Sequence, residues 1–263
     1  VLGLSGGIDS TLVAALAAEA IGPENLLCVM MPSPFSSEGS IKDSEVLIRN
    51  LGCQGRIEPI SDTFEVLLRQ MDLHSPTKGG ESLAAENMQS RIRGVILMAI
   101  SNAEGRLLLS TGNKSELAVG YCTLYGDTNG GLAVLGDVLK TEVWEIARQI
   151  NKNAGHEIIP EKVIDKAPSA ELAPNQFDQD SLPPYELMDP ILQMYFEQKA
   201  SPTEIIAAGN DAELVYNILK KVESPANEFK RRQLPPTLII SKNAIGVGRR
   251  RPITHKYRRK PEA

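Results

Sequence analysis

The segment that most constrains this chain is the loop Leu4-Ser5-Gly6-Gly7-Ile8-Asp9-Ser10, which lies between a strand-like run at 1–4 and a helical pattern at 11–20. Two consecutive glycines let backbone N–H groups approach an anion closely, and the following helix N-terminus adds free donors and a favourable dipole. Ser5 and Ser10 add hydroxyl groups, and Ser10 is placed to cap the helix. The loop therefore predicts a phosphate site.

Asp9 indicates what kind of phosphate site this is. A Walker A loop, GxxxxGK[ST], carries a lysine, whereas this loop has none and contains a carboxylate. Because a carboxylate repels phosphate oxygens unless a cation lies between them, Asp9 predicts Mg²⁺ bridging to a polyphosphate. The alternative is a structural glycine-rich turn in which Asp9 only caps the helix.

The first two-thirds of the chain alternate strand-like and helix-like segments, which is the order of a parallel sheet with crossover helices. We therefore predict an α/β fold in which an open parallel sheet carries helices on both faces. The predicted strands are 1–4, 26–31, 56–60 and 106–111, and the predicted helices are 11–20, 42–51, 64–71 and 84–102. Polar loops at 33–40 and 73–83 have the composition of ligand-binding loops or of surface insertions.

From Pro160 onward the strand signals fade into helical patterns separated by prolines. We predict one domain over 1–263 with three parts. These are an α/β nucleotide-binding core over 1–160, a helical extension over 161–229 and a basic tail over 230–263. The helical patterns of the extension cover 185–198, 202–208 and 211–222.

The net charge of −5 hides an uneven distribution. Up to residue 229 there are 17 basic and 32 acidic residues, a charge of −15, whereas the rest of the chain holds 11 basic residues and one acidic residue, a charge of +10. Such a tail can be a nucleic-acid arm, a solvated end or the wall of a polyphosphate site. Charge alone does not choose between these three.

Cysteine usage and hydropathy exclude several classes of protein. The cysteines are three in number and form no CxxC pair, which argues against a disulfide framework and a Cys-rich metal site. No apolar run approaches the roughly 20 residues that a membrane helix needs, and no secretion signal is visible. We expect a cytoplasmic protein with no membrane contact. Because Val1 already belongs to a strand-like run, we also expect residues upstream of it.

A second motif, Ser110-Thr111-Gly112-Asn113-Lys114-Ser115-Glu116, follows the strand predicted at 106–111. Ligands of open α/β sheets bind at the carboxyl ends of strands, so Glu116 could be a second metal carboxylate and Thr111 could reach a nucleotide. The alternative is an ordinary turn in which Ser115 caps a helix and Glu116 complements its dipole.

Arg91 and Arg93 directly precede an apolar run in the helix predicted at 84–102. Charges so close to a buried stretch need a partner, and a dinucleotide phosphate or a carboxylate suits the guanidinium fork. The alternative is that both are surface arginines whose stems cover apolar neighbours.

The SGGIDS loop resembles the signature of the N-type ATP pyrophosphatases, which adenylate a substrate oxygen and release pyrophosphate from ATP. The further segments resemble NAD synthetases in particular, over nearly the whole chain from Leu2 to about Arg232. This resemblance implies the adenine nucleotide alpha hydrolase-like, Rossmann-like fold. The segments are VMMPSPFSSEG at 29–39, ENMQSRIRG at 86–94, STGNKSE at 110–116, GYCTLYGD at 120–127, DVLKT at 137–141 and FKRRQ at 229–233.

The resemblance implies roles for individual residues. Asp9 and Glu116 would bind Mg²⁺, and Asp9 and Lys140 would act in catalysis. Deamido-NAD, bound largely across a homodimer interface, would contact Asn87, Arg91, Glu116 and Lys230. ATP would contact Gly3, Leu4, Ser5, Gly6, Gly7, Ile8, Asp9, Ser10, Thr111, Lys140 and Ser169.

One departure from the ammonia-dependent pattern concerns the source of nitrogen. Where the stand-alone enzymes have a lysine before YGD, this chain has Leu124. Together with the long basic tail, this is more similar to the synthetase half of the glutamine-dependent form, in which an upstream amidase domain supplies ammonia. No such domain is present between Val1 and Ala263, and the cysteines lie in contexts unsuited to an amidase nucleophile.

The predicted reaction is the ATP-dependent amidation of deamido-NAD to NAD through an acyl-adenylate, with ammonia as the nitrogen donor and AMP and pyrophosphate as products. The sequence shows no Ser/His/Asp triad, and we expect His74, His156 and His255 at the surface. The basic tail is then a substrate-facing end, with no nucleic-acid partner. The alternatives are a GMP synthetase, a tRNA-modifying enzyme or a non-catalytic nucleotide-binding module.

Overall fold

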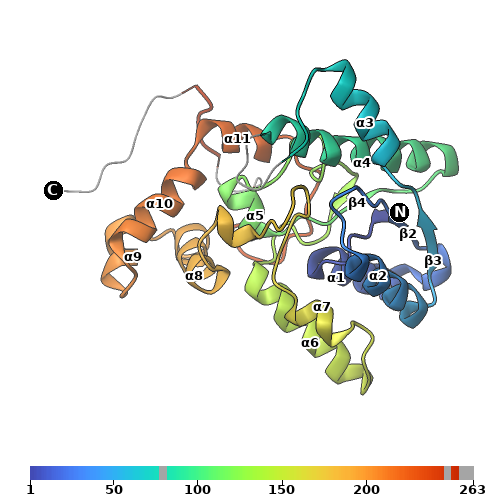
Figure 1. Ribbon diagram of the computed structural model, residues 1–263. Coiled ribbons are helices and arrows are strands. Elements are labelled where there is room, and N and C mark those ends of the chain that lie inside the picture. Colours follow the sequence, from blue (N-terminus) through green and yellow to red (C-terminus); the bar gives the residue numbers. More distant parts are fainter. Residues whose placement is uncertain (77–81, 246–249, 255–263) are drawn as a thin grey trace.

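The computed structural model describes residues 1–76, 82–245 and 250–254 (Figure 1). Its strands are β1 (Leu2–Gly3), β2 (Leu27–Met30), β3 (Gln54–Ile57), β4 (Leu109–Ser110) and β5 (Leu132–Ala133). Its α-helices are α1 (Ile8–Ile21), α2 (Glu38–Leu51), α3 (Ser61–Gln70), α4 (Leu83–Glu104), α5 (Lys114–Val119), α6 (Lys140–Ala154), α7 (Glu161–Asp165), α8 (Tyr185–Phe196), α9 (Pro202–Ala207), α10 (Ala212–Val222) and α11 (Pro225–Arg231). Two 3-10 turns, η1 (Pro23–Asn25) and η2 (Asp178–Asp180), complete the described elements.

All strand pairs are parallel, as predicted. β1 pairs with β2 and β2 with β3, while β4 pairs with β5. The Leu109 N–H donates to the Val1 carbonyl at 2.9 Å, which places β4 beside β1 and gives the order β3-β2-β1-β4-β5. The chain therefore reverses its direction of strand addition between β1 and β4, the place where open α/β sheets bind ligands.

Helices cover both faces of the sheet because successive side chains of a strand point to opposite sides. Leu2 and Cys28 belong to the buried cluster that α1 and α6 complete, whereas Val1, Leu27 and Val29 belong to the cluster completed by α3 and α4. Figure 1 shows α1, α2, α6 and α7 on one side and α3 and α4 on the other. The predicted fold class is confirmed.

The C-terminal helices form a third apolar cluster. α8, α9 and α10 supply most of its buried side chains, and α5 adds Ala118 and Val119. Trp144 of α6 packs against both this cluster and the α1 cluster. The extension is thus helical as predicted, but it shares apolar residues with the core, and the boundaries at 160 and 229 stay predictions. No helix among the described residues has the length and apolar character needed to cross a membrane.

Two local predictions, and one detail of an alternative, differ from the structure. Only Leu109 and Ser110 of the run predicted at 106–111 pair as a strand, because α4 continues to Glu104 and the Arg106 N–H still donates to the Ser101 carbonyl. Ser10 does not cap α1, which starts two residues earlier with Gly7 as its N-cap. Asn113, and not Ser115, caps α5, since its side chain accepts the Glu116 N–H at 3.0 Å.

A buried ion pair joins the core to the C-terminal segment. The Lys114 ammonium lies 3.0 Å from the Asp137 carboxylate and 2.8 Å from Glu197, and neither Lys114 nor Asp137 has any exposed side-chain surface. Asp137 also accepts the N–H groups of Ile240 and Ser241 at 2.9 and 2.6 Å. Residues 240–241 are therefore held against the end of the sheet through one carboxylate.

We expect Lys114→Met to lower the free energy of unfolding by about 3 kcal/mol, because it leaves a buried carboxylate without its cation. Urea unfolding followed by circular dichroism measures the change. The matched variant Lys42→Met removes an exposed pair with Glu38 and should cost less than about 0.5 kcal/mol. Equal losses in the two variants would contradict a special role for the buried pair.

Candidate nucleotide and active site

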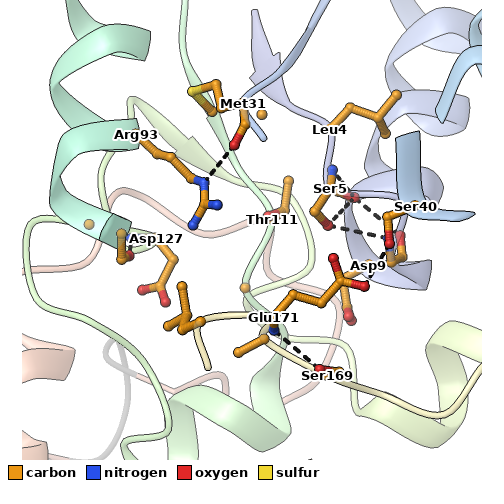
Figure 2. A pocket seen from close by; sticks show the side chains of 18 of the residues that line it. Leu4, Ser5, Asp9, Met31, Ser40, Arg93, Thr111, Asp127, Ser169 and Glu171 are labelled. Atoms are coloured by element: carbon orange, nitrogen blue, oxygen red, sulfur yellow. Dashed lines mark hydrogen bonds between the residues drawn. The ribbon is translucent and has the colours of Figure 1, made fainter. Parts of the chain in front are cut away.

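A pocket of about 290 Å³ opens at the carboxyl ends of β1 and β4. The glycine loop of residues 4–10 forms one wall, α4 supplies Arg93 and Leu97, and the segment 166–172 after α7 lies across it. Figure 2 shows Ser5 and Asp9 on the α1 side and Arg93 on the α4 side, with Thr111 of the β4–α5 turn between them. The pocket thus lies at the point where the strand order reverses, between β1 and β4.

The glycine loop has the geometry of an anion site. Gly6 adopts a positive φ of 76°, and an added Cβ there would lie 2.4 Å from the Ser40 carbonyl oxygen. The Gly7 N–H donates to the Ser5 hydroxyl at 3.2 Å, and the Ser10 hydroxyl donates to the Gly7 carbonyl at 3.1 Å. The loop is thus shaped by its own hydroxyl groups, at the N-terminus of a 14-residue helix.

Two carboxylates and one ammonium meet beside this loop. Lys140, at the start of α6 and almost fully buried, donates to Asp9 and lies 3.4 Å from Glu116. Asn113 donates its amide to the other Asp9 oxygen at 2.8 Å. Lys140 also lies over the ring of Tyr185, 5.4 Å from its centroid. Asp9, Glu116 and Lys140 come from three separate elements, so the fold itself assembles the group.

Burial and charge oppose one another in this group. Burial raises the pKa of Glu116 to about 8, with the charge of Asp9 adding to the effect and Lys140 opposing it. Burial alone would lower the pKa of Lys140, but Asp9 and Glu116 outweigh burial and raise that pKa. Lys140 therefore stays charged at neutral pH, and the pocket contains a fixed cation next to the phosphate loop.

The carboxylates of this group bear on metal binding. No group of three or more His, Cys, Asp or Glu side chains in the described parts of the chain is arranged to hold a metal. Mg²⁺, however, is usually bound by one or two carboxylates together with substrate phosphates and water. Asp9 and Glu116 both form ion pairs with Lys140 and both line the pocket. They supply two carboxylates and fit that mode of binding.

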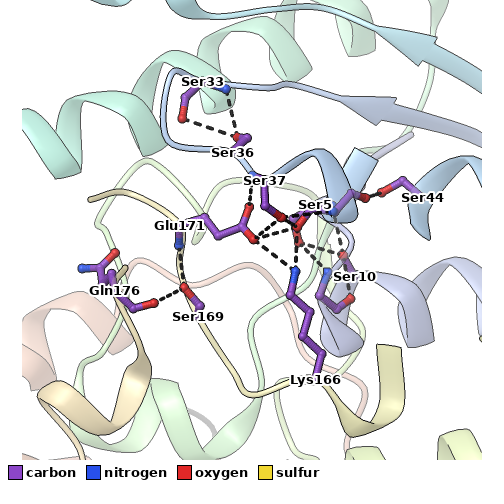
Figure 3. A network of polar contacts seen from close by, with 12 residues as sticks. Ser5, Ser10, Ser33, Ser36, Ser37, Ser44, Lys166, Ser169, Glu171 and Gln176 are labelled. Atoms are coloured by element: carbon purple, nitrogen blue, oxygen red, sulfur yellow. Dashed lines mark hydrogen bonds and ion pairs between the residues drawn. The ribbon is translucent and has the colours of Figure 1, made fainter. Parts of the chain in front are cut away.

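A hydroxyl-rich network holds the segment 166–172 over the pocket (Figure 3). Glu171 accepts the Ser40 hydroxyl at 2.7 Å and the Ser37 hydroxyl at 3.1 Å, both at the start of α2. Lys166 donates to Ser40 at 2.6 Å and to Glu171 at 3.1 Å. Glu171 has a positive φ of 48°, and its N–H donates to the Ser169 hydroxyl at 3.1 Å. The network closes one side of the pocket.

Comparisons with known proteins show the family of this chain. The model of the family described as NAD synthase matches residues 1–235. The chain belongs to the NAD synthase family. A curated relative, the glutamine-dependent NAD(+) synthetase of Synechocystis sp., is 53% identical over 260 residues, which cover 98% of this chain and 45% of the relative. The chain thus spans a little under half the length of that relative.

Two solved structures are also similar. The glutamine-dependent NAD+ synthetase from Acinetobacter baumannii, in complex with adenosine diphosphate, is 42% identical with a TM-score of 0.60, over 96% of this chain and 44% of that one. The NH3-dependent NAD synthetase from Campylobacter jejuni is 26% identical with a TM-score of 0.68, over 91% of this chain and 88% of that one. Both likenesses extend over nearly all of this chain.

The residues that the family resemblance assigned to ATP lie together. All of them line the pocket except Gly6, which lies against the backbone of Ser40. Ser169 lines it from the segment 166–172, where its hydroxyl donates to the Gln176 carbonyl. Their contacts with ATP stay predictions. The pocket-lining members are Gly3, Leu4, Ser5, Gly7, Ile8, Asp9, Ser10, Thr111, Lys140 and Ser169.

Three residues assigned to deamido-NAD lie outside the pocket lining and share another feature, which is a contact with the segment 120–127. Asn87 accepts the Thr123 hydroxyl at 2.8 Å, and Arg91 donates to the Leu124 carbonyl at 3.1 Å. Lys230 donates to the carbonyls of Gly120 and Cys122, each at 2.8 Å. The fourth, Glu116, lines the pocket. Binding by these residues stays a prediction, but three of them shape the loop that carries Asp127 into the pocket.

Some pocket residues were missed by the sequence analysis. Asp127 and Asp178 line the pocket, and burial raises the pKa of Asp127 to about 6. Lys166 and Glu171 also line the pocket and flank Ser169 in the sequence. The polar run KAPSAEL at 166–172 was therefore the signal that could have predicted them. His74 and His156 are exposed as predicted, whereas His255, the loop residues 77–81 and much of the basic tail lie outside the described residues.

We expect Gly6→Ala to weaken ATP binding and to lower the free energy of unfolding. The left-handed backbone alone costs an alanine about 1–2 kcal/mol, and the contact with the Ser40 carbonyl adds to it. Isothermal titration with ATP and urea unfolding measure the two effects. Gly7→Ala is the control for stability, because its Cβ would meet only the Ser5 hydroxyl at 3.3 Å. An unfolding energy lowered equally in both variants would contradict this account.

Proposed function

We propose that this chain carries out the synthetase reaction of an NAD synthetase, the ATP-dependent amidation of deamido-NAD to NAD with release of AMP and pyrophosphate. The observation that carries the proposal is the meeting of Asp9, Glu116 and Lys140 beside the glycine loop. A fixed cation with two carboxylates at a helix N-terminus suits cleavage of a polyphosphate more than simple nucleotide storage. Membership of the NAD synthase family supplies the substrate class.

Adenylation is the first step of the proposed mechanism. An oxygen of the nicotinate carboxylate attacks the α-phosphorus of ATP, the bond from that phosphorus to the β-phosphate oxygen breaks, and its electron pair leaves with pyrophosphate. The backbone N–H groups of the glycine loop and the Lys140 ammonium bind the leaving group as its charge develops. The hydroxyl groups of Ser5 and Ser10 hold the loop in the required shape.

Amidation is the second step. Hydroxide is a poor leaving group, so ammonia does not displace it from a carboxylate, whereas AMP leaves readily from the acyl-adenylate. Ammonia attacks the acyl carbon, the bond to the AMP oxygen breaks, and a proton is lost from nitrogen to give the amide. The protein's part in both steps is to hold the reactants in line and to exclude water, which the segment 166–172 over the pocket favours.

Mg²⁺ belongs to this proposal through Asp9 and Glu116, which would hold it. When bound, the ion neutralises charge on the phosphate oxygens during pyrophosphate release. The positive charge of the ion would favour the ionised form of Glu116 and so oppose the effect of burial on the pKa of that carboxyl.

The nitrogen donor is proposed to be ammonia made from glutamine by an amidase domain in the same polypeptide. The support is the similarity to a glutamine-dependent relative more than twice as long as the matched region. Within the chain, burial raises the pKa of Cys122 to about 12, and Cys28 is fully buried, so neither thiol suits nucleophilic attack. We also propose that the chain works in the cytoplasm as a homodimer, in keeping with the resemblance described above.

The reaction predicts which substrates release pyrophosphate. With ATP, Mg²⁺, deamido-NAD and ammonium chloride, the chain should release pyrophosphate and form NAD in equal amounts, as followed by a coupled pyrophosphate assay and chromatography. Omitting deamido-NAD, or replacing it with xanthosine monophosphate, should leave only background release. Release with xanthosine monophosphate would favour a GMP synthetase instead.

Asp9→Asn should lower the rate of pyrophosphate release by at least about 100-fold, because a carboxylate that binds the metal is lost. Asn113 and Lys140 donate to different Asp9 oxygens, and the amide keeps only one of these oxygens. Because Lys140 still has Glu116 as a partner, the fold should stay intact while the thermal midpoint falls. Activity near that of the unmodified chain, over a full Mg²⁺ titration, would rule out Asp9 as a metal ligand.

A further inference from the structure

One cation of the pocket takes no part in the mechanism described so far. Arg93 lies on α4, lines the pocket and is only partly exposed. Its Nε donates to the Met31 carbonyl at 3.1 Å, at the carboxyl end of β2 (Figure 2). This contact fixes the direction of the guanidinium, which lines the pocket on the side opposite α1 (Figure 2).

Within residues 1–76, 82–245 and 250–254, the two terminal nitrogens of Arg93 have no hydrogen-bond partner. Among the described residues, no carboxylate lies within 4.0 Å of the guanidinium, and Nε makes its only hydrogen bond. Burial lowers the pKa of Arg93 to about 10, with Glu171 as the opposing charge, so the side chain stays cationic at neutral pH. A partly buried guanidinium whose fork is free and preorganised is suited to a bidentate anion.

The position of Arg93 selects which anion it meets. Met31 and Leu97 line the pocket beside Arg93 and give that end an apolar surface, which suits a purine base. The glycine loop and Lys140 lie at the other end and suit the leaving pyrophosphate. In ATP the anionic group nearest the base is the α-phosphoryl group, and Figure 2 shows Thr111 between Arg93 and Ser5 of the glycine loop.

We propose that Arg93 binds the α-phosphoryl group of ATP through its two terminal nitrogens and keeps this contact in the acyl-adenylate. The inference rests on the proposed function, since it places Arg93 at the phosphorus that the substrate carboxylate attacks. Arg93 transfers no proton. It balances charge on the non-bridging oxygens while the new oxygen–phosphorus bond forms and the bond to pyrophosphate breaks.

Binding of three nucleoside ligands tests the proposal without turnover. Arg93→Gln keeps an amide that can donate to Met31 but removes the charge, and Arg93→Lys keeps the charge but not the fork. Titration calorimetry with adenosine, AMP and ADP should show that Arg93→Gln weakens AMP and ADP by similar factors of about 10- to 100-fold and leaves adenosine unchanged. Arg93→Lys should recover part of the loss.

The matched control is Arg49→Gln, which removes an exposed arginine from α2 and should alter none of the three affinities. Unchanged AMP affinity in Arg93→Gln would overturn the proposal, as would a raised KM for deamido-NAD with AMP binding intact. Equal weakening of adenosine, AMP and ADP together with a lowered thermal midpoint would make Arg93 a structural residue and would also overturn it. If the unmodified chain failed to form NAD while Arg93→Gln still lost AMP selectively, the proposed function would fall and the anion contact would stand.

Discussion

The contact on which the site depends is the ammonium of Lys140 between the carboxylates of Asp9 and Glu116. It joins the start of α1, the start of α5 and the start of α6, three helices that follow different strands or turns. A buried lysine is costly unless it is paired, so the three segments must converge for any of them to be stable there. The same convergence places the Lys140 ammonium beside the glycine loop, where a polyphosphate needs a cation. The ion pairs of Lys140 therefore serve both the stability of the fold and the proposed chemistry.

Parallel strand order explains why the convergence is possible. β1 and β4 are neighbours although about a hundred residues separate them, and the Leu109 N–H on the Val1 carbonyl fixes that neighbourhood. Every parallel strand presents its carboxyl end on the same edge, so the loops after β1 and β4 open side by side. The glycine loop and the turn bearing Glu116 are therefore brought together by topology, before any side-chain contact is made.

Local chemistry was readable in the sequence, whereas long-range contacts were not. The two glycines and Asp9 predicted the phosphate loop, and the alternation of strand-like with helix-like segments predicted the sheet with helices on both faces. The length of β4 was not predictable, because strand pairing depends on partners elsewhere in the chain. Nor was the contact of Glu171 with Ser37 and Ser40, which spans more than 130 residues and leaves no periodic signal.

The contacts of Asn87, Arg91 and Lys230 refine what the resemblance implied. All three hold the backbone or side chains of the segment 120–127, and none lines the pocket. Arginine, asparagine and lysine side chains near a site can therefore have two different roles, which are contact with a substrate and support of the loop that forms the wall of the pocket. Arg93 differs from Arg91 in just this respect. Both donate Nε to a backbone carbonyl, but only Arg93 lines the pocket, where its remaining donors are free for an anion.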